Sequence, residues 1–191
     1  MHFTLSIIVA SALFGSSLAQ ADIRDIDIYP DSAVCNDHDG TGLQCGNIGS
    51  LVCCQDGGRD IFSAQCRGLN TQDVADQCVI AINDGPGTLS CKTALKAESG
   101  NSIICLDPDT SPAATGAFWV ELRQKRSFRR GQAVQCTSSV KPDKAFFGSR
   151  SFRINYDVPT NVTDYLMGLI KTDPSLSNEI PGDVLKYEIA K

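Results

Sequence analysis

The sequence predicts an α+β domain: β-rich, stapled by disulfides, small, secreted and carrying one or two short helices. Two observations favour this class. Eight of the nine cysteines lie between Cys35 and Cys105, and strand-like apolar runs outnumber helix-like ones along the chain. Each bridge contributes about 2–4 kcal/mol by restricting the unfolded chain, so several bridges together rival the net stability of a small domain.

The chain begins with a pattern typical of a secretory signal peptide over residues 1–19. A short apolar core from Leu5 to Phe14 leads to small residues, and we expect cleavage after Ala19, with cleavage after Ala21 as the alternative. This core is too short to span a bilayer and no later run approaches that length, so no transmembrane segment is expected. The sequence therefore predicts a secreted, extracellular protein, in a compartment where disulfides persist.

Beyond the signal, the chain divides by composition. Residues 22–109 form an acidic cysteine-rich region, residues 110–115 a loop or linker, and residues 116–191 a β-rich region with one helix, which we expect to pack with the first as one domain. The net charge is −9 over residues 22–115 and +6 over residues 116–158. This balance makes nucleic acid an unlikely partner for the whole protein, but it leaves room for a local basic patch.

Three strands are expected in the acidic region. Ile26 and Ile28 alternate with aspartates ahead of Pro30, which predicts an edge strand closed by proline. Continuous apolar runs at residues 51–54 and 103–106 predict short buried strands. Together they point to at least part of a sheet in this half of the chain.

A helix is expected between these strands. Val74, Cys78 and Ile82 recur at four-residue spacing, which predicts one buried helical face, and Asn70 or Thr71 can cap its start. The run Asn83–Gly87 contains asparagine, aspartate, proline and two glycines, which ends the helix.

Three strands and a second helix are expected in residues 116–191. Alternating apolar residues favour strands at 118–122, 152–158 and 185–189, and the second of these is the clearest amphipathic strand in the chain. Apolar residues at helical spacing over 162–171, with Pro174 beyond them, predict a short helix.

The cysteines are expected to be structural. No Cys-x-x-Cys pair occurs, so neither a zinc site nor a thioredoxin-like motif is expected, and we expect no metal and no cofactor. Cys53 and Cys54 are adjacent and cannot easily bond to each other, so they should clamp two different segments. An odd count leaves one thiol free or joins two chains in a disulfide-linked dimer. The disulfide candidates are Cys35, Cys45, Cys53, Cys54, Cys66, Cys78, Cys91, Cys105 and Cys136.

The cysteine order resembles that of the class II hydrophobins of filamentous fungi over residues 45–105. The single cysteines and the first adjacent pair match, whereas Lys92 stands where the partner of Cys91 would complete a second pair. The resemblance implies surface activity and the bridges Cys45–Cys91, Cys53–Cys78 and Cys54–Cys66, with Cys105 left to pair with Cys35 or Cys136. More broadly, the chain resembles the small secreted cysteine-rich proteins of fungi, many of which are called effectors.

No catalytic residue is expected. His38 is the only histidine left after removal of the signal, and it lies between two aspartates in a glycine-rich turn, so catalytic arrangements that need histidine lack support. The same turn lacks the closing glutamate of a calcium loop, because Ile48 stands at the twelfth position from Asp37. Aspartate pairs for glycoside hydrolysis remain open, because spacing does not show which carboxylates face each other.

A basic stretch with nearby aromatic residues is the candidate contact surface. It can bind an anionic polysaccharide, phospholipid headgroups or nucleic acid, and its dibasic pairs can instead be cut by secretory convertases. The alternative without a binding role is a solvated strand and turn whose positive charges balance the negative charge of the acidic half of the chain. The candidate binding residues are Arg123, Lys125, Arg126, Arg129, Arg130 and Trp119.

Asn161 begins an Asn-Val-Thr acceptor site, which predicts an N-linked glycan, although Asn161 or Thr160 can instead cap a helix. Taken together, the sequence predicts a secreted, non-enzymatic, effector-like protein that binds an extracellular or host-surface target: a protein, a polysaccharide or an anionic surface. The alternatives are a hydrophobin-like protein that assembles at interfaces and a small secreted hydrolase that uses aspartates or His38.

Overall fold

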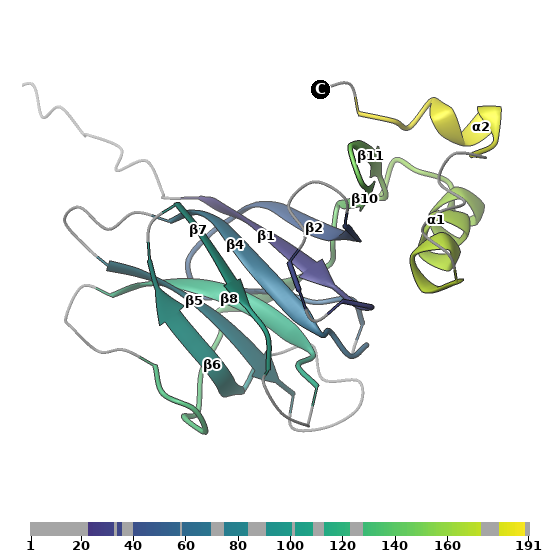
Figure 1. Cartoon of the computed structure of the whole chain (residues 1–191). Helices are drawn as coiled ribbons and strands as arrows, with labels where there is room; N and C mark the ends of the chain where they lie inside the picture. Colours follow the sequence, from purple (N-terminus) through teal and green to yellow (C-terminus); the bar gives the residue numbers. More distant parts are fainter. Residues whose placement is uncertain are drawn as a thin grey trace, which may run out of the picture.

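Two β-sheets packed face to face form the body of the molecule in the computed structural model (Figure 1). The structure describes residues 23–32, 34–35, 40–57, 59–69, 75–83, 91–100, 102–108, 113–122, 128–172 and 180–189. The predicted signal peptide, the turn around His38 and half of the predicted linker lie outside the described residues.

The first sheet has six strands, and all its neighbouring strands are antiparallel. In spatial order they are β11 (Arg150–Arg153), β10 (Lys144–Phe147), β2 (Thr41–Ile48), β1 (Arg24–Tyr29), β4 (Ser63–Leu69) and β7 (Ser102–Leu106).

The second sheet has five strands and is antiparallel except for the pairing of β3 with β9, which is parallel. In spatial order they are β6 (Thr93–Ser99), β5 (Ala75–Ile82), β8 (Gly116–Leu122), β3 (Val52–Cys54) and β9 (Ser138–Val140). Strands from the acidic and the basic regions share both sheets.

Two helices, α1 (Thr160–Thr172) and α2 (Gly182–Leu185), lie beyond the β10–β11 hairpin at one end of the sandwich (Figure 1). α1 is the helix predicted at residues 162–171. Neither helix of the described residues is long and apolar enough to cross a membrane. With eleven strands and two short helices in the described part of the chain, the fold is mostly β, and the prediction of an α+β domain is wrong.

Strands β2, β4, β6, β9 and β10 were not predicted, and two further elements were predicted with the wrong type. The predicted helix containing Cys78 and Ile82 is β5, which pairs with β6 and β8 on its two sides. A spacing of four residues is a multiple of two, so it also places side chains on one face of a strand. The predicted strand at residues 185–189 is α2 followed by a turn, and only Glu188 makes a bridge, with Phe152.

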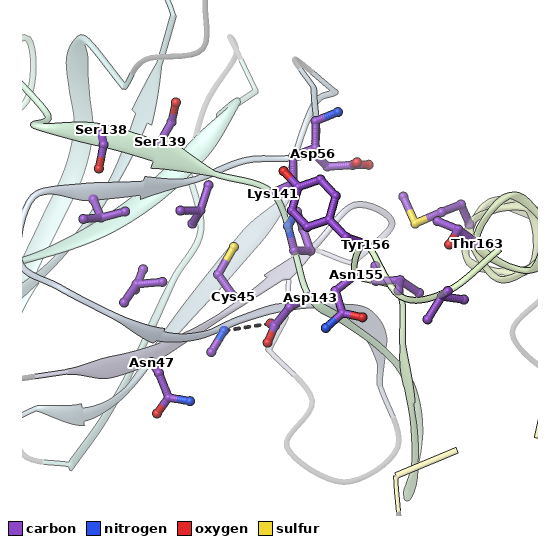
Figure 2. A pocket seen from close by; sticks show the side chains of 18 of the residues that line it. Cys45, Asn47, Asp56, Ser138, Ser139, Lys141, Asp143, Asn155, Tyr156 and Thr163 are labelled. Carbon is purple, nitrogen blue, oxygen red and sulfur yellow. Dashed lines mark hydrogen bonds between the residues drawn. The ribbon is translucent and has the colours of Figure 1, made fainter. Parts of the chain in front are cut away.

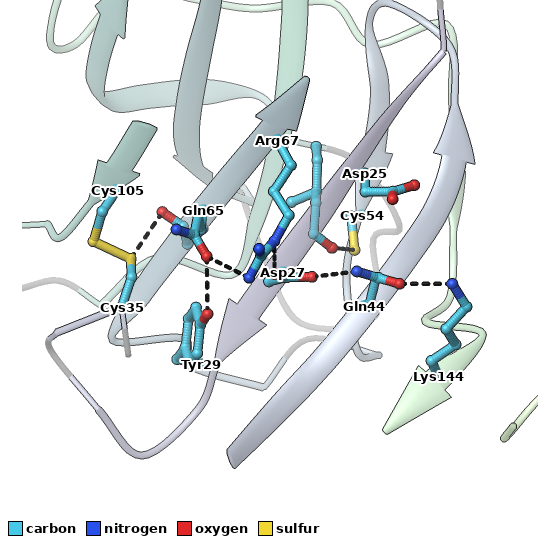
Figure 3. Close-up of polar contacts among 12 residues, drawn as sticks. Asp25, Asp27, Tyr29, Cys35, Gln44, Cys54, Gln65, Arg67, Cys105 and Lys144 are labelled. Atoms are coloured by element: carbon cyan, nitrogen blue, oxygen red, sulfur yellow. Dashed lines mark hydrogen bonds and ion pairs between the residues drawn. A yellow bond between two sulfur atoms is a disulfide. The ribbon is translucent and has the colours of Figure 1, made fainter. Parts of the chain in front are cut away.

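β1 is a central strand rather than the predicted edge strand, because it pairs with β2 and β4. Its Asp27 is only 1 % exposed, yet it is stabilised by neighbours from both flanking strands. Gln44 Nε2 donates to Asp27 Oδ1 at 2.7 Å, and Arg67 Nε donates to Asp27 Oδ2 (Figure 3). An alternating aspartate can therefore sit in the middle of a sheet when adjacent strands supply its hydrogen bonds.

The predicted strand at residues 152–158 ends early. β11 stops at Arg153, and the chain then turns, with Val158 N donating to Asn155 O at 3.0 Å. Pro159 follows, and its carbonyl accepts from Val162 N at 3.0 Å at the start of α1. The turn separates the β10–β11 hairpin from the helix and gives the groove described below one of its walls.

Four disulfides hold the sandwich together. Cys45–Cys54 joins β2 to β3 and Cys66–Cys78 joins β4 to β5, so both link one sheet to the other. Cys53–Cys91 ties β3 to the segment before β6, and Cys35–Cys105 ties the loop after β1 to β7. The adjacent cysteines of β3 bond to different segments because successive strand residues point to opposite faces.

The three bridges that the hydrophobin resemblance implied are therefore wrong. In this sandwich, Cys54 faces the core between the sheets, whereas Cys53 belongs to a second apolar cluster with Cys91, Phe118 and Val134. The pairing follows which face each cysteine occupies, and cysteine order alone does not carry that information. Of the two partners left open for Cys105, the structure selects Cys35.

Candidate ligand-binding groove

A groove of about 1000 Å³ opens where the ends of β2, β3 and β9 meet the turn between β11 and α1 (Figure 2). Its floor is apolar and includes Val52, Val140, Ile154 and Val158, which belong to or pack on the main core. Polar side chains surround this floor. An apolar base with a few convergent polar groups is the usual composition of a small-molecule site.

Asp143 fixes one side of the groove. Its Oδ1 accepts from Gly46 N at 2.9 Å, its own amide donates to Gln44 O at 2.9 Å, and its carbonyl accepts from Ile154 N at 3.0 Å. A Cβ on Gly46 would lie 3.3 Å from Asp143 Oδ2, so glycine allows this close approach. Asp143 thus connects β2 with the segment that follows β11 and holds the groove in shape.

Asp56 lies on the opposite side of the groove (Figure 2). It forms an ion pair with Arg59 at 3.0 Å. Burial raises the pKa of the Asp56 carboxyl above its usual range, while Arg59, Lys171 and Lys141 oppose that rise. A carboxyl whose pKa is raised by desolvation inside a groove is a typical feature of functional sites.

The turn between β11 and α1 contributes Asn155 and Tyr156. Tyr156 has a relative exposure of 105 %, so the whole side chain stands in solvent at the groove. The Oδ1 atom of Asn155 is buried and has no hydrogen-bond partner among the described residues. A buried polar atom of this kind costs free energy unless a ligand or water satisfies it.

The predicted basic surface is only partly described. Arg129 and Arg130 are exposed on the turn that follows residue 128, whereas Arg123, Lys125 and Arg126 lie outside the described residues. None of the residues that line the groove comes from this stretch.

Trp119 is not a surface residue, which corrects its place among the candidate binding residues. It is 1 % exposed, its Nε1 donates to Ile48 O at 2.9 Å, and the Arg24 guanidinium lies 5.0 Å from its ring centroid. It faces inward because alternation along β8 places it between the sheets.

The groove was not predicted from the sequence. The alternation over residues 152–158 placed Tyr156 on the apolar face of a predicted strand. The available signal was the composition of residues 155–159, where Asn155, Asp157 and Pro159 favour a turn. Asn161 is exposed on the first turn of α1, and the glycan there remains a prediction.

Two packed, mostly antiparallel sheets cross-linked by buried disulfides define this protein as a disulfide-rich β-sandwich domain. Residues 25–143 match the family model of the ARB_05566_N family, which is described as an N-terminal domain, and the chain belongs to this family. The match covers β1 to β9, so β10, β11 and both helices lie outside it. No curated protein and no solved structure matches the chain.

These comparisons give no link to hydrophobins or to fungal effectors. Between Cys53 and Cys105, the exposed large hydrophobic side chains of the described residues are Phe62 and Ile103. Two such side chains are ordinary for a protein surface and do not by themselves favour a film-forming protein.

Proposed function

We propose that this protein is a secreted, non-enzymatic binding protein whose groove takes a neutral oligosaccharide segment of an extracellular polysaccharide. The observation that carries the proposal is the fully exposed ring of Tyr156 beside the unpartnered amide oxygen of Asn155. A sugar ring offers an apolar C–H face and a rim of hydroxyls. An exposed aromatic ring takes the face, and amide and carboxylate oxygens accept hydrogen bonds from the hydroxyls.

Charge favours a neutral ligand. Asp56, Asp143 and Asp164 line the groove together with Arg59 and Lys141, so acids slightly outnumber bases. A site for an anionic polysaccharide would instead concentrate positive charge. The groove therefore differs in charge from the exposed arginines at residues 129–130, which suit an anionic surface.

Rigidity supports recognition. Asp143 is fixed by three hydrogen bonds to main-chain groups, and the groove floor is continuous with the core. Tyrosine adds a large contact surface with few rotatable bonds, so little conformational entropy is lost when the ligand binds.

The extracellular location is supported by the bridges. Four disulfides in a chain of this size are typical of proteins that fold in an oxidising compartment. A binding role outside the cell agrees with that compartment.

Calorimetric titration of the secreted full-length protein with short neutral oligosaccharides tests the proposal. We expect saturable binding that Tyr156→Ala weakens by about tenfold, which corresponds to loss of one aromatic contact. Phe62→Ala is the matched control, because Phe62 is an exposed aromatic residue (47 %) that does not line the groove. Absence of binding across neutral glycans, or equal affinity of Tyr156→Ala and the native protein, would overturn the proposal.

One observation favours a second candidate, a glycoside hydrolase. The pKa of Asp56 is raised by burial, as a general acid requires, and two further aspartates line the same groove. Release of reducing ends from a bound oligosaccharide, abolished by Asp56→Asn, would establish hydrolysis in place of binding alone.

A further inference from the structure

Three sulfur atoms gather beside the second sheet. Cys53 and Cys91 form a disulfide, Cys136 carries a free thiol, and their Sγ atoms all lie within 4.8 Å of one another. Cys53 and Cys91 are fully buried, whereas Cys136 is partly exposed and packs on the same apolar cluster. The free thiol therefore has a disulfide as its immediate neighbour.

The backbone holds this arrangement on both sides of Cys136. Val134 N donates to Lys92 O at 2.6 Å, next to Cys91, and Thr137 N donates to Leu51 O at 2.9 Å, close to Cys53. β9 then pairs in parallel with β3. The segment carrying Cys136 is thus pinned between the two segments that the bridge joins.

The main chain of β8 covers one side of the Cys53–Cys91 disulfide. A Cβ placed on Gly116 would lie 2.8 Å from both bridge sulfurs, so the main chain of β8 packs directly against them. Cys136, by contrast, is partly exposed to solvent, and its Sγ lies within 4.8 Å of both bridge sulfurs.

We infer that Cys136 and the Cys53–Cys91 disulfide form an intramolecular thiol–disulfide exchange site. Solvent base removes the proton from the Cys136 thiol, and the thiolate attacks one bridge sulfur. A new S–S bond forms to Cys136, the Cys53–Cys91 bond breaks, and the released sulfur leaves as a thiolate that takes up a proton. The number of disulfides and of thiols is unchanged, so the step needs no oxidant and no reductant.

Burial sets the rate of the exchange. It raises the pKa of the Cys136 thiol to about 11, against an opposing hydrogen bond from the Cys91 main chain. Because only the thiolate is a nucleophile, exchange is slow at neutral pH and accelerates as the pH rises. The same cluster offers a single thiol while the bridge is intact, so in this state it is an exchange site rather than a metal site.

The exchange bears on the groove. Cys136 lies two residues before β9, and Ser138, Ser139 and Val140 of β9 line the groove. Moving the bridge from Cys53 or Cys91 to Cys136 ties the start of β9 covalently to the sheet. The linkage state of these three cysteines thus controls how firmly one groove wall is held.

Disulfide mapping of the native full-length protein tests this inference directly. The protein is incubated at several pH values from 7 to 10, quenched in acid and alkylated, and its peptides are then mapped without reduction. At neutral pH we expect the label on Cys136 alone. At alkaline pH we expect it also on Cys53 or Cys91, with Cys136 in a new bridge and a rate that rises about tenfold per pH unit. Label confined to Cys136 throughout, or spread over the other three bridges as global scrambling, overturns the inference.

Single substitutions give an independent readout. In secreted Cys53→Ser protein, Cys91 should pair with Cys136, leaving no free thiol, and Cys91→Ser should likewise pair Cys53 with Cys136. Cys78→Ser is the matched control, because its partner Cys66 has no such neighbour in the described sulfur cluster and should stay free with Cys136. Two free thiols in Cys53→Ser protein would contradict the exchange site.

Discussion

The indole nitrogen of Trp119 donates a hydrogen bond to the main-chain carbonyl of Ile48, 2.9 Å away, and so connects β8 of one sheet with β2 of the other. Trp119 is also among the largest fully buried side chains of the core. A single side chain therefore fills the space between the sheets and satisfies a buried carbonyl.

Trp119→Phe should lower the free energy of unfolding by about 1–3 kcal/mol, because the Ile48 carbonyl loses its donor and a small cavity remains. Urea unfolding at neutral pH, with the disulfides intact, measures this change. Phe62→Leu, at an exposed site, should change stability by no more than about 0.5 kcal/mol. Equal effects of the two substitutions would contradict the structural role of the indole.

The four bridges should differ in their resistance to reduction. Cys105 is exposed and Cys35 partly so, whereas Cys45, Cys54, Cys66 and Cys78 are buried at 0–1 % exposure. A reducing thiolate must reach a sulfur to attack it, so Cys35–Cys105 should open first in native protein and the inter-sheet bridges only on unfolding. Timed reduction followed by alkylation and peptide mapping checks the order, and simultaneous loss of all four would refute it.

Asp27 should make the stability depend on pH in a defined direction. Burial raises the pKa of its carboxyl from 3.8, while Arg67 and Gln44 oppose that rise. The folded state then holds this proton more tightly than the unfolded state, so the contribution is favourable at low pH and is lost as the pH rises through the folded pKa.

The difference in unfolding free energy between native protein and Asp27→Asn isolates this group from the other carboxylates. We expect the native protein to lose stability relative to Asp27→Asn as the pH increases from about 4 through the pKa of Asp27 in the folded state. Chemical unfolding at several pH values measures it. A difference that rises with pH would show that the ion pair with Arg67 outweighs burial.

The exposed arginines test the anionic-surface hypothesis separately from the groove. Arg129→Glu with Arg130→Glu should reduce retention on an anionic matrix at low salt, because two positive charges become negative. Neutral glycan binding should stay unchanged, since neither residue lines the groove. Chromatography at two salt concentrations checks the first expectation, and unchanged retention would remove these residues as a contact surface.

Asn161 should carry an N-linked glycan when the protein is secreted from a eukaryotic host. Its side chain is exposed on the first turn of α1, so a glycan there has access to solvent. Mass spectrometry before and after enzymatic deglycosylation measures it, and Asn161→Gln should abolish the difference. The same spectra report whether the mature chain begins after Ala19 or after Ala21.

Five of the eleven strands in the described part of the chain were predicted from local pattern, namely β1, β3, β7, β8 and part of β11, but the roles of several could not be predicted. The continuous run at β3 and the alternation at β8 hold wherever those strands pair, so their residues alone predicted them. β1 was predicted as an edge strand because a buried aspartate is not expected in a central strand. In the structure, Gln44 and Arg67 of the flanking strands supply hydrogen bonds to Asp27 (Figure 3). β5 was predicted as a helix because the four-residue spacing of its apolar residues suits a helix and a strand equally.

The groove was beyond prediction for a different reason. Its walls come from β2, β3, β9 and the turn before α1, which are far apart in sequence. Asn155 and Tyr156 matter because they follow a strand that ends early and line the same groove as Asp143, and that arrangement depends on strand pairing that local pattern does not encode.

By itself the sequence determined that disulfides brace this chain, that adjacent Cys53 and Cys54 serve different segments, and that one amphipathic helix follows the strands, because each depends on residues close together. Only the tertiary structure decided which cysteines pair, which strands are central and where a ligand fits. Those outcomes depend on which faces of distant strands meet, and the free energy of that packing belongs to the assembled sandwich rather than to any one stretch.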